Sequence, residues 1–145
     1  MDWSRLLPRV DEGYSGPKAS LYFLVLVAAT GVVRSVIHML AADGGAQSIA
    51  GLAVGVEGGP NIVAIFGQWG ASQLILALLM WLVILRYRFL VPCMLAVTFL
   101  EQLLRLGVGQ LKPLQVAATP PGAIGSVILL PLSFVALWVS LRRSA

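Results

Sequence analysis

The sequence predicts an all-α integral membrane protein with four transmembrane helices in an antiparallel bundle. A glycine-rich outer segment is expected between the first two helices. Of the 145 residues, 59% are hydrophobic and 11% are charged, whereas an average soluble protein carries about 25% charged residues. Four apolar runs are each close to the roughly 20 residues that cross a hydrocarbon core. Basic residues gather at the ends of these runs, which is typical of membrane topology.

The first two apolar runs predict spans over residues 20–42 and 61–85. The first should end at Asp43-Gly44-Gly45, because glycine commonly follows the last turn of a helix. The second contains no formally charged residue and closes at Arg86-Tyr87-Arg88. Both runs therefore have the length and polarity of a membrane-crossing helix.

The last two runs predict spans over residues 89–106 and 122–141. Pro92 falls in the first turn of the third span, where a missing N–H matters least, and Gly107 and Gly109 are expected to end that helix. In the fourth span serine recurs every seven residues, at Ser126, Ser133 and Ser140. Such a line of small residues favours close packing against another helix in lipid.

The remaining segments connect these spans or flank them. Residues 43–60 alternate glycines with apolar residues, which fits an interfacial or re-entrant turn and equally fits an ordinary loop. We interpret the whole chain, 1–145, as a single transmembrane domain. Within it, residues 1–18 form a cytoplasmic or interfacial N-terminal segment.

The distribution of basic residues predicts the orientation. The N-terminal segment, the short connection after the second span and the C-terminus carry Arg5, Arg9, Lys18, Arg86, Arg88, Arg142 and Arg143. The opposite side carries Lys112 alone. By the positive-inside rule, both termini are expected to be cytoplasmic, in the cell (inner) membrane.

Several classes of function do not fit this composition. The net charge of +4 does not come from basic residues clustered with aromatics on one face, so nucleic-acid binding is not expected. The chain has a single cysteine, Cys93, and a single histidine, which excludes an internal disulfide and a four-ligand structural zinc site. No P-loop, nucleophile elbow or HExxH motif occurs, and we expect no metal or cofactor.

Ionisable residues inside two of the spans are the main functional signal. Arg34 and His38 are four residues apart in the first span, and so are Glu101 and Arg105 in the third, so each pair shares one helix face. Because both spans run outward, a rise of about 1.5 Å per residue places all four in the outer half of the bundle. Charges inside a bilayer are costly and usually face protein or water, where they mark function.

Uncharged polar residues are expected at the same depth. Gln68 and Asn61 in the second span lie seven residues apart, and Gln102 follows Glu101. We therefore predict a ligand-binding cluster of Arg34, Asn61, Gln68, Gln102 and Arg105. Arg34, Arg105 and Glu101 sum to +1, so an anion should neutralise the cluster. Asp43, Glu57 or an anionic ligand are the candidates.

Three interpretations of this cluster remain open. It is a pocket that binds a lipophilic or anionic-headed ligand, or docks a partner membrane subunit or a second copy of the chain. Alternatively, the protein is a membrane-embedded isomerase, cyclase or hydrolase in which His38 and Glu101 supply acid–base catalysis to a lipid-soluble substrate. A purely structural network that fixes helix register is the third. Ion transport is disfavoured, because the inner half lacks polar residues to complete a path.

Overall fold

Four long helices account for most of the computed structural model, which describes residues 14, 16–116 and 118–142. They are α1 (Lys18–Leu40), α2 (Gly59–Leu85), α3 (Val91–Leu111) and α4 (Pro121–Ser140), with a short 3₁₀ turn η2 (Arg88–Leu90) before α3. No strand occurs among the described residues. Each helix is long and apolar enough to cross a membrane, counting η2 with α3. The prediction of an all-helical chain with four candidate spans is therefore confirmed.

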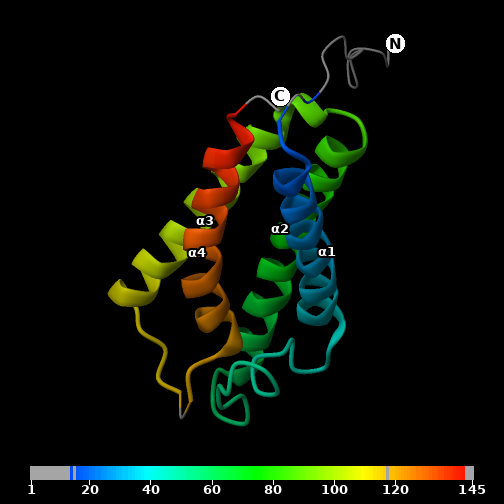
Figure 1. Cartoon of the computed structure of the whole chain (residues 1–145). Helices are drawn as coiled ribbons and strands as arrows, with labels where there is room; N and C mark the ends of the chain where they lie inside the picture. Colours follow the sequence, from blue (N-terminus) through cyan, green and yellow to red (C-terminus); the bar gives the residue numbers. More distant parts are fainter. Residues whose placement is uncertain (1–13, 15, 117, 143–145) are drawn as a thin grey trace, which may run out of the picture.

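The connections between the helices lie at two opposite ends of the molecule (Figure 1). The start of α1, the end of α4 and the connection between α2 and α3 share one end, which we call the terminal end. The segment 41–58 and the connection between α3 and α4 share the other, which we call the loop end. The predicted N-terminal segment 1–18 lies outside the described residues except for Tyr14 and residues 16–18.

The observed third helix corrects one predicted boundary. Helix α3 continues past Gly107 and Gly109 to Leu111, so these glycines do not end it. Neither has a positive φ. In an apolar environment the backbone must satisfy its own hydrogen bonds, which favours continuing the helix. It ends at Leu111, and the next residue, Lys112, has a non-helical backbone (φ −135°, ψ 73°), in keeping with the bias against helical conformation before Pro113.

The hydrophobic core lies in the half of the molecule nearest the terminal end. It contains buried side chains from all four helices: Leu24, Ala28, Met80, Val83, Ile84, Val91, Leu95 and Ala136. The Ser20 hydroxyl donates to the Ala136 carbonyl at 3.0 Å and joins α1 to α4 there. Ser126, Ser133 and Ser140 are all buried, as the predicted packing seam requires.

Helices α1 and α2 approach each other closely at Gly70. A Cβ atom at this position would lie 2.7 Å from the His38 Cβ, 3.1 Å from the Ser35 carbonyl oxygen and 3.2 Å from the Met39 Cγ. Real Cβ atoms essentially never come as near as 2.7 Å to another carbon, so only glycine permits this approach. Gly70 thereby fixes which face of α2 lies against α1.

We expect Gly70→Ala to push α1 and α2 apart and to destabilise the protein by about 1–3 kcal/mol, as overpacking of a close contact does. The measurement is thermal or denaturant unfolding in detergent. Gly107→Ala is the matched control, because a Cβ at Gly107 meets nothing within 4 Å. Equal stability of the two variants would contradict the packing described here.

Candidate functional site

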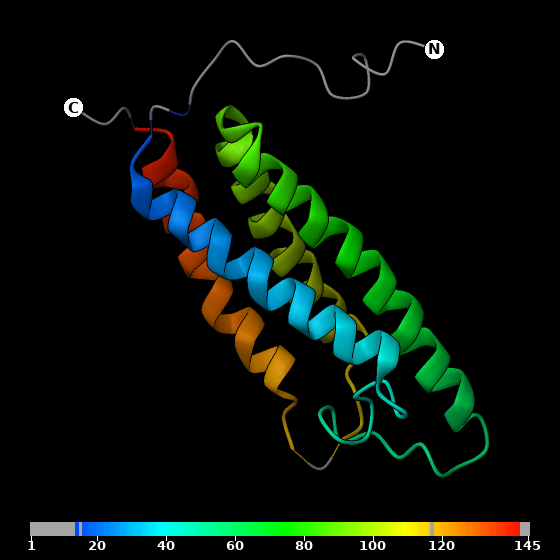
Figure 2. The ribbon, with the colours of Figure 1, turned by 90° about the vertical axis from the view of Figure 1, so that its right-hand side faces the viewer.

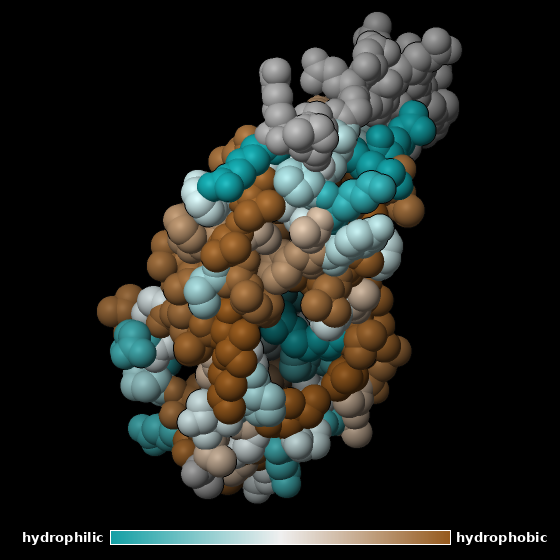
Figure 3. All heavy atoms as spheres, viewed as in Figure 1, coloured by the Kyte–Doolittle hydropathy of each residue, from teal (hydrophilic) through white to brown (hydrophobic). Residues whose placement is uncertain are grey.

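Two adjoining cavities lie between the α1–α2 pair and the α3–α4 pair. The outer cavity has a volume of about 580 Å³ and is bounded by the loop-end halves of the helices and by segment 41–58. The inner cavity, of about 430 Å³, lies closer to the core. Both are lined by Arg34, Ile49, Gly122 and Ser126, so they lie directly next to each other. The space-filling view shows a hydrophilic hollow with hydrophobic surface on either side (Figure 3).

Arg34 of α1 lies at the junction of the two cavities. Its Nη2 donates to Gln73 Oε1 of α2 at 2.8 Å, and its guanidinium carbon lies 5.1 Å from the centre of the Trp69 ring. The Arg34 Nε is buried and has no hydrogen-bond partner in the described part of the chain. The guanidinium therefore has an amide and an aromatic face as partners, and no carboxylate of a described residue lies within ion-pair distance of it.

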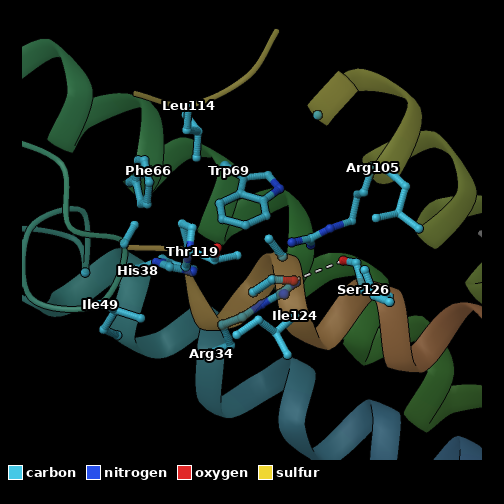
Figure 4. Close-up of a pocket in the computed structure, with 18 of the residues that line it drawn as sticks. Arg34, His38, Ile49, Phe66, Trp69, Arg105, Leu114, Thr119, Ile124 and Ser126 are labelled. Atoms are coloured by element: carbon cyan, nitrogen blue, oxygen red, sulfur yellow. Dashed lines mark hydrogen bonds between the residues drawn. The ribbon is translucent and has the colours of Figure 1, made fainter. Parts of the chain in front are cut away.

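Arg105 of α3 reaches the same aromatic ring. Its guanidinium carbon also lies 5.1 Å from the Trp69 ring centre, and its Nη1 forms an ion pair with Glu101 Oε1 at 3.4 Å. The other Glu101 oxygen accepts a hydrogen bond from Gln102 Nε2 at 2.9 Å. Figure 4 shows Arg34 and Arg105 converging on the space beside Trp69 from different helices. Both oxygens of Glu101 are thus engaged within α3, while two guanidiniums meet at the cavity.

His38 of α1 is held in one orientation by the segment that follows α1. Its Nδ1 lies 2.7 Å from the Gly44 carbonyl oxygen, and a carbonyl oxygen can only accept, so Nδ1 carries a proton. The ring packs against Trp69 and Phe66, with ring centres 4.9 and 5.5 Å away. The side chain lines the outer cavity, and Nε2 has no hydrogen-bond partner among the described residues.

Asp43 shapes the turn that presents this carbonyl group. Its Oδ1 accepts from the Gly45 N–H at 2.9 Å, and its Oδ2 accepts from the N–H groups of Ser48 and Gln47 at 2.6 and 3.1 Å. Gly44 and Gly45 adopt φ values of +59° and +74°, which side chains disfavour. The backbone N–H groups of Ser48 and then Gly45 lower the pKa of Asp43 from 3.8 to about 2. Its carboxylate is therefore engaged in this turn.

The other predicted site residues are distributed unevenly. Glu101 and Gln102 line the inner cavity and not the outer one, so His38 and Glu101 open onto different cavities. Gln68 and Asn61 are exposed and line neither cavity. Glu57 is also exposed. Among the described residues no group of three or more His, Cys, Asp or Glu side chains is placed to hold a metal ion.

Sequence reasoning missed Trp69 and Gln73, the two α2 residues that contact Arg34. A signal for them was present. Gly70, Gln73 and Ala77 recur at spacings of three and four, which places them on one helix face. Gln68 is five residues from Gln73 and therefore points about 140° away around the helix. Small residues mark the helix face that packs against a neighbouring helix. Gln73 lies on that face, so it was the better candidate for a contact with Arg34.

We expect acid to loosen the Asp43 turn. Because the pKa of Asp43 is lowered in the folded chain, its contribution to stability is complete above the ordinary value of 3.8 and is lost as pH falls toward about 2. Protection of the Gly45 and Ser48 amides, measured as the exchange rate relative to the intrinsic rate at each pH, should fall over this interval. Asp43→Asn should show lower protection already at neutral pH and no further loss between pH 4 and 2. Identical acid profiles in the two proteins would contradict this role.

Comparison with known proteins identifies no relative. No family model matches the chain, and neither the curated proteins nor the solved structures contain a match. The functional assignment therefore rests on the chemistry of the two cavities.

Proposed function

We propose that this protein is an antiparallel four-span membrane bundle, with both termini cytoplasmic, that binds an amphiphile by its anionic head. The orientation is supported by the basic residues Lys18, Arg86, Arg88 and Arg142, which lie at the terminal end. Lys112 is at the loop end. The positive-inside rule then directs the cavities toward the outer half of the membrane.

The observation that carries the binding proposal is the position of Arg34 beside Arg105. Glu101 neutralises one guanidinium through its ion pair with Arg105, and Arg34 has no carboxylate within ion-pair distance among the described residues. Asp43 is engaged by its own turn. The three charges Arg34, Arg105 and Glu101 sum to +1, and an uncompensated cation in an apolar environment is expensive. A bound anion removes this cost.

The donor geometry and the lining indicate the kind of anion. Guanidinium groups bind carboxylate and phosphate in a bidentate manner, and Arg34 retains a buried Nε without an acceptor. Most of the outer cavity is apolar, with Ile49, Phe66 and Leu114 among its lining residues. A carboxylate or phosphate attached to a hydrophobic body satisfies both requirements, whereas a free anion satisfies only the first.

Acid–base catalysis on a lipid-soluble substrate is the second candidate, and the geometry of His38 favours it. The proton on Nδ1 is directed to Gly44, which leaves Nε2 at the cavity as a proton acceptor when the ring is neutral. Glu101 lines the other cavity, so the predicted acid–base pair is not assembled around one substrate position. Binding is therefore the better supported function. A turnover of any lipid-soluble substrate that His38→Gln abolishes would favour the enzyme instead.

The proposed orientation is tested by cysteine accessibility in a Cys93→Ser background. Gly51→Cys and Lys112→Cys should react with a membrane-impermeant maleimide in intact cells. A cysteine replacing Arg88 serves as the opposite-side control and should react only after the membrane is opened. The reverse pattern would overturn the orientation.

A charge series at the cavity tests the binding function. In nanodiscs of zwitterionic lipid we expect Arg34→Gln to weaken dodecyl phosphate binding by roughly 10–100-fold, since a hydrogen bond to a charged group contributes about 1.5–3 kcal/mol. Glu101→Gln, which raises the cluster charge to +2, should tighten binding. The double variant Glu101→Gln/Arg105→Gln restores +1 and should bind more tightly than Arg34→Gln.

Uncharged dodecanol and inorganic phosphate are the ligand controls. Dodecanol binding should not follow the charge series, and inorganic phosphate should bind far more weakly than the alkyl phosphate. Unfolding temperatures of the ligand-free variants separate lost binding from lost folding. Equal dodecyl phosphate affinities across folded variants would mean that the cluster only fixes helix register.

A further inference from the structure

We propose that the inner cavity holds the hydrocarbon chain of the ligand, so that the bound molecule is a single-chain amphiphile of limited chain length. This inference rests on the proposed function, because it takes the anionic head to lie at Arg34. It adds a second subsite, a direction for the ligand and a limit on its size.

The two cavities meet at the side chain that would hold the head. Arg34 lines both of them, together with Ile49, Gly122 and Ser126. A head bound at this guanidinium therefore lies at the entrance of the inner cavity. We therefore place the chain attached to the head in the inner cavity.

The polar side chains of the inner cavity already have hydrogen bonds within the protein. The Thr30 hydroxyl donates to the carbonyls of Leu26 and Val27 at 2.9 and 3.0 Å. Gln102 donates to Glu101, and Gln73 accepts from Arg34. The Ser126 hydroxyl donates to the Gly122 carbonyl at 3.1 Å. Glu101, which also lines this cavity, is paired with Gln102 and Arg105. Each of these groups thus keeps a partner within the protein, so an apolar chain can lie beside them.

The part of the inner cavity farthest from Arg34 is apolar. Its lining there consists of Leu26, Val27, Leu76, Ala77, Met80 and Leu129. Met80 is 3% exposed and belongs to the hydrophobic core, so it forms the floor. Leu26 precedes Arg34 by eight residues, or about 12 Å along α1. A chain longer than this depth must leave the cavity.

A route to the bilayer exists between α1 and α4. Leu26 of α1 is 60% exposed and lines the inner cavity, as do the exposed Thr30 and the half-buried Gly125 and Leu129 of α4. The two helices are joined at the terminal end by the Ser20–Ala136 hydrogen bond and separate toward the loop end (Figure 2). The inner cavity therefore admits a chain sideways from lipid. Its volume of about 430 Å³ is in the range that holds one drug-sized molecule, which favours one chain over two.

The experiment measures the affinity of monoalkyl phosphates, from ethyl to hexadecyl, for the full chain in zwitterionic nanodiscs, with binding to empty nanodiscs subtracted. We expect affinity to rise about fourfold for each added methylene and then to stop rising once the chain reaches Met80. A continuous rise from ethyl to hexadecyl, or no rise at all, would overturn the limited chain pocket. This readout requires no variant.

Gly125→Leu provides the matched variant. Gly125 lines the inner cavity, and a Cβ there meets nothing within 4 Å, so the leucine can fill the cavity without a backbone clash. It should weaken decyl phosphate by at least tenfold and leave ethyl phosphate unchanged. Gly107→Leu, equally free of neighbours and lining neither cavity, should change neither.

The outcomes separate the two proposals. Arg34→Gln should weaken every alkyl phosphate by a similar factor. If Arg34→Gln does so while Gly125→Leu leaves decyl phosphate unchanged, the head site stands and the chain subsite is refuted. If Arg34→Gln leaves all affinities unchanged, the proposed function itself fails.

Discussion

The uncompensated guanidinium of Arg34 is the constraint on which the loop-end half of this structure depends. The guanidinium donates a hydrogen bond to Gln73, and its carbon lies 5.1 Å from the centre of the Trp69 ring. Helix α2 must therefore direct both side chains toward α1. Gly70 lies between them in sequence and allows the helices to approach closely enough. Trp69 also contacts Arg105, which links α3 to the same ring. An internal carboxylate for Arg34 would complete the charge balance, but Glu101 is already paired within α3. Arg34 therefore has no carboxylate partner among the described residues, which is the observation behind the proposed anion site.

The two halves of the molecule differ in how tightly they are packed. Near the terminal end, apolar side chains from all four helices form the core, and the Ser20–Ala136 hydrogen bond holds α1 against α4. Toward the loop end, the α1–α2 pair and the α3–α4 pair separate and leave two adjoining cavities between them. The core at the terminal end holds the two pairs together, so they can separate at the loop end without losing that core.

The glycine-rich segment has a specific structural task within this arrangement. Positive φ angles at Gly44 and Gly45 and three N–H groups held by the Asp43 carboxylate produce a compact turn. The turn orients the Gly44 carbonyl toward His38 and places Ile49 on both cavities. A segment that reads as loop or interfacial turn in the sequence is therefore part of the cavity wall. The contacts that form this turn lie within the segment and with the adjacent His38, so they do not depend on where the segment lies relative to a membrane.

The apolar runs and the basic residues at their ends were enough to predict the four helices. A long apolar segment in lipid must form its backbone hydrogen bonds internally, which a helix does. They also placed Arg34, His38, Glu101 and Arg105 at similar depths, since depth follows from the rise per residue. Tertiary structure decided what depth cannot: the rotation of each helix about its axis. With Gly70 against α1, the rotation of α2 about its axis brings Gln73 and Trp69 to Arg34 and leaves Gln68 exposed. By depth Glu101 could have paired with either arginine, and in the structure it pairs with Arg105, four residues further along the same helix. Rotation depends on which side chains interlock between helices, and that information lies in pairs of segments far apart in the chain.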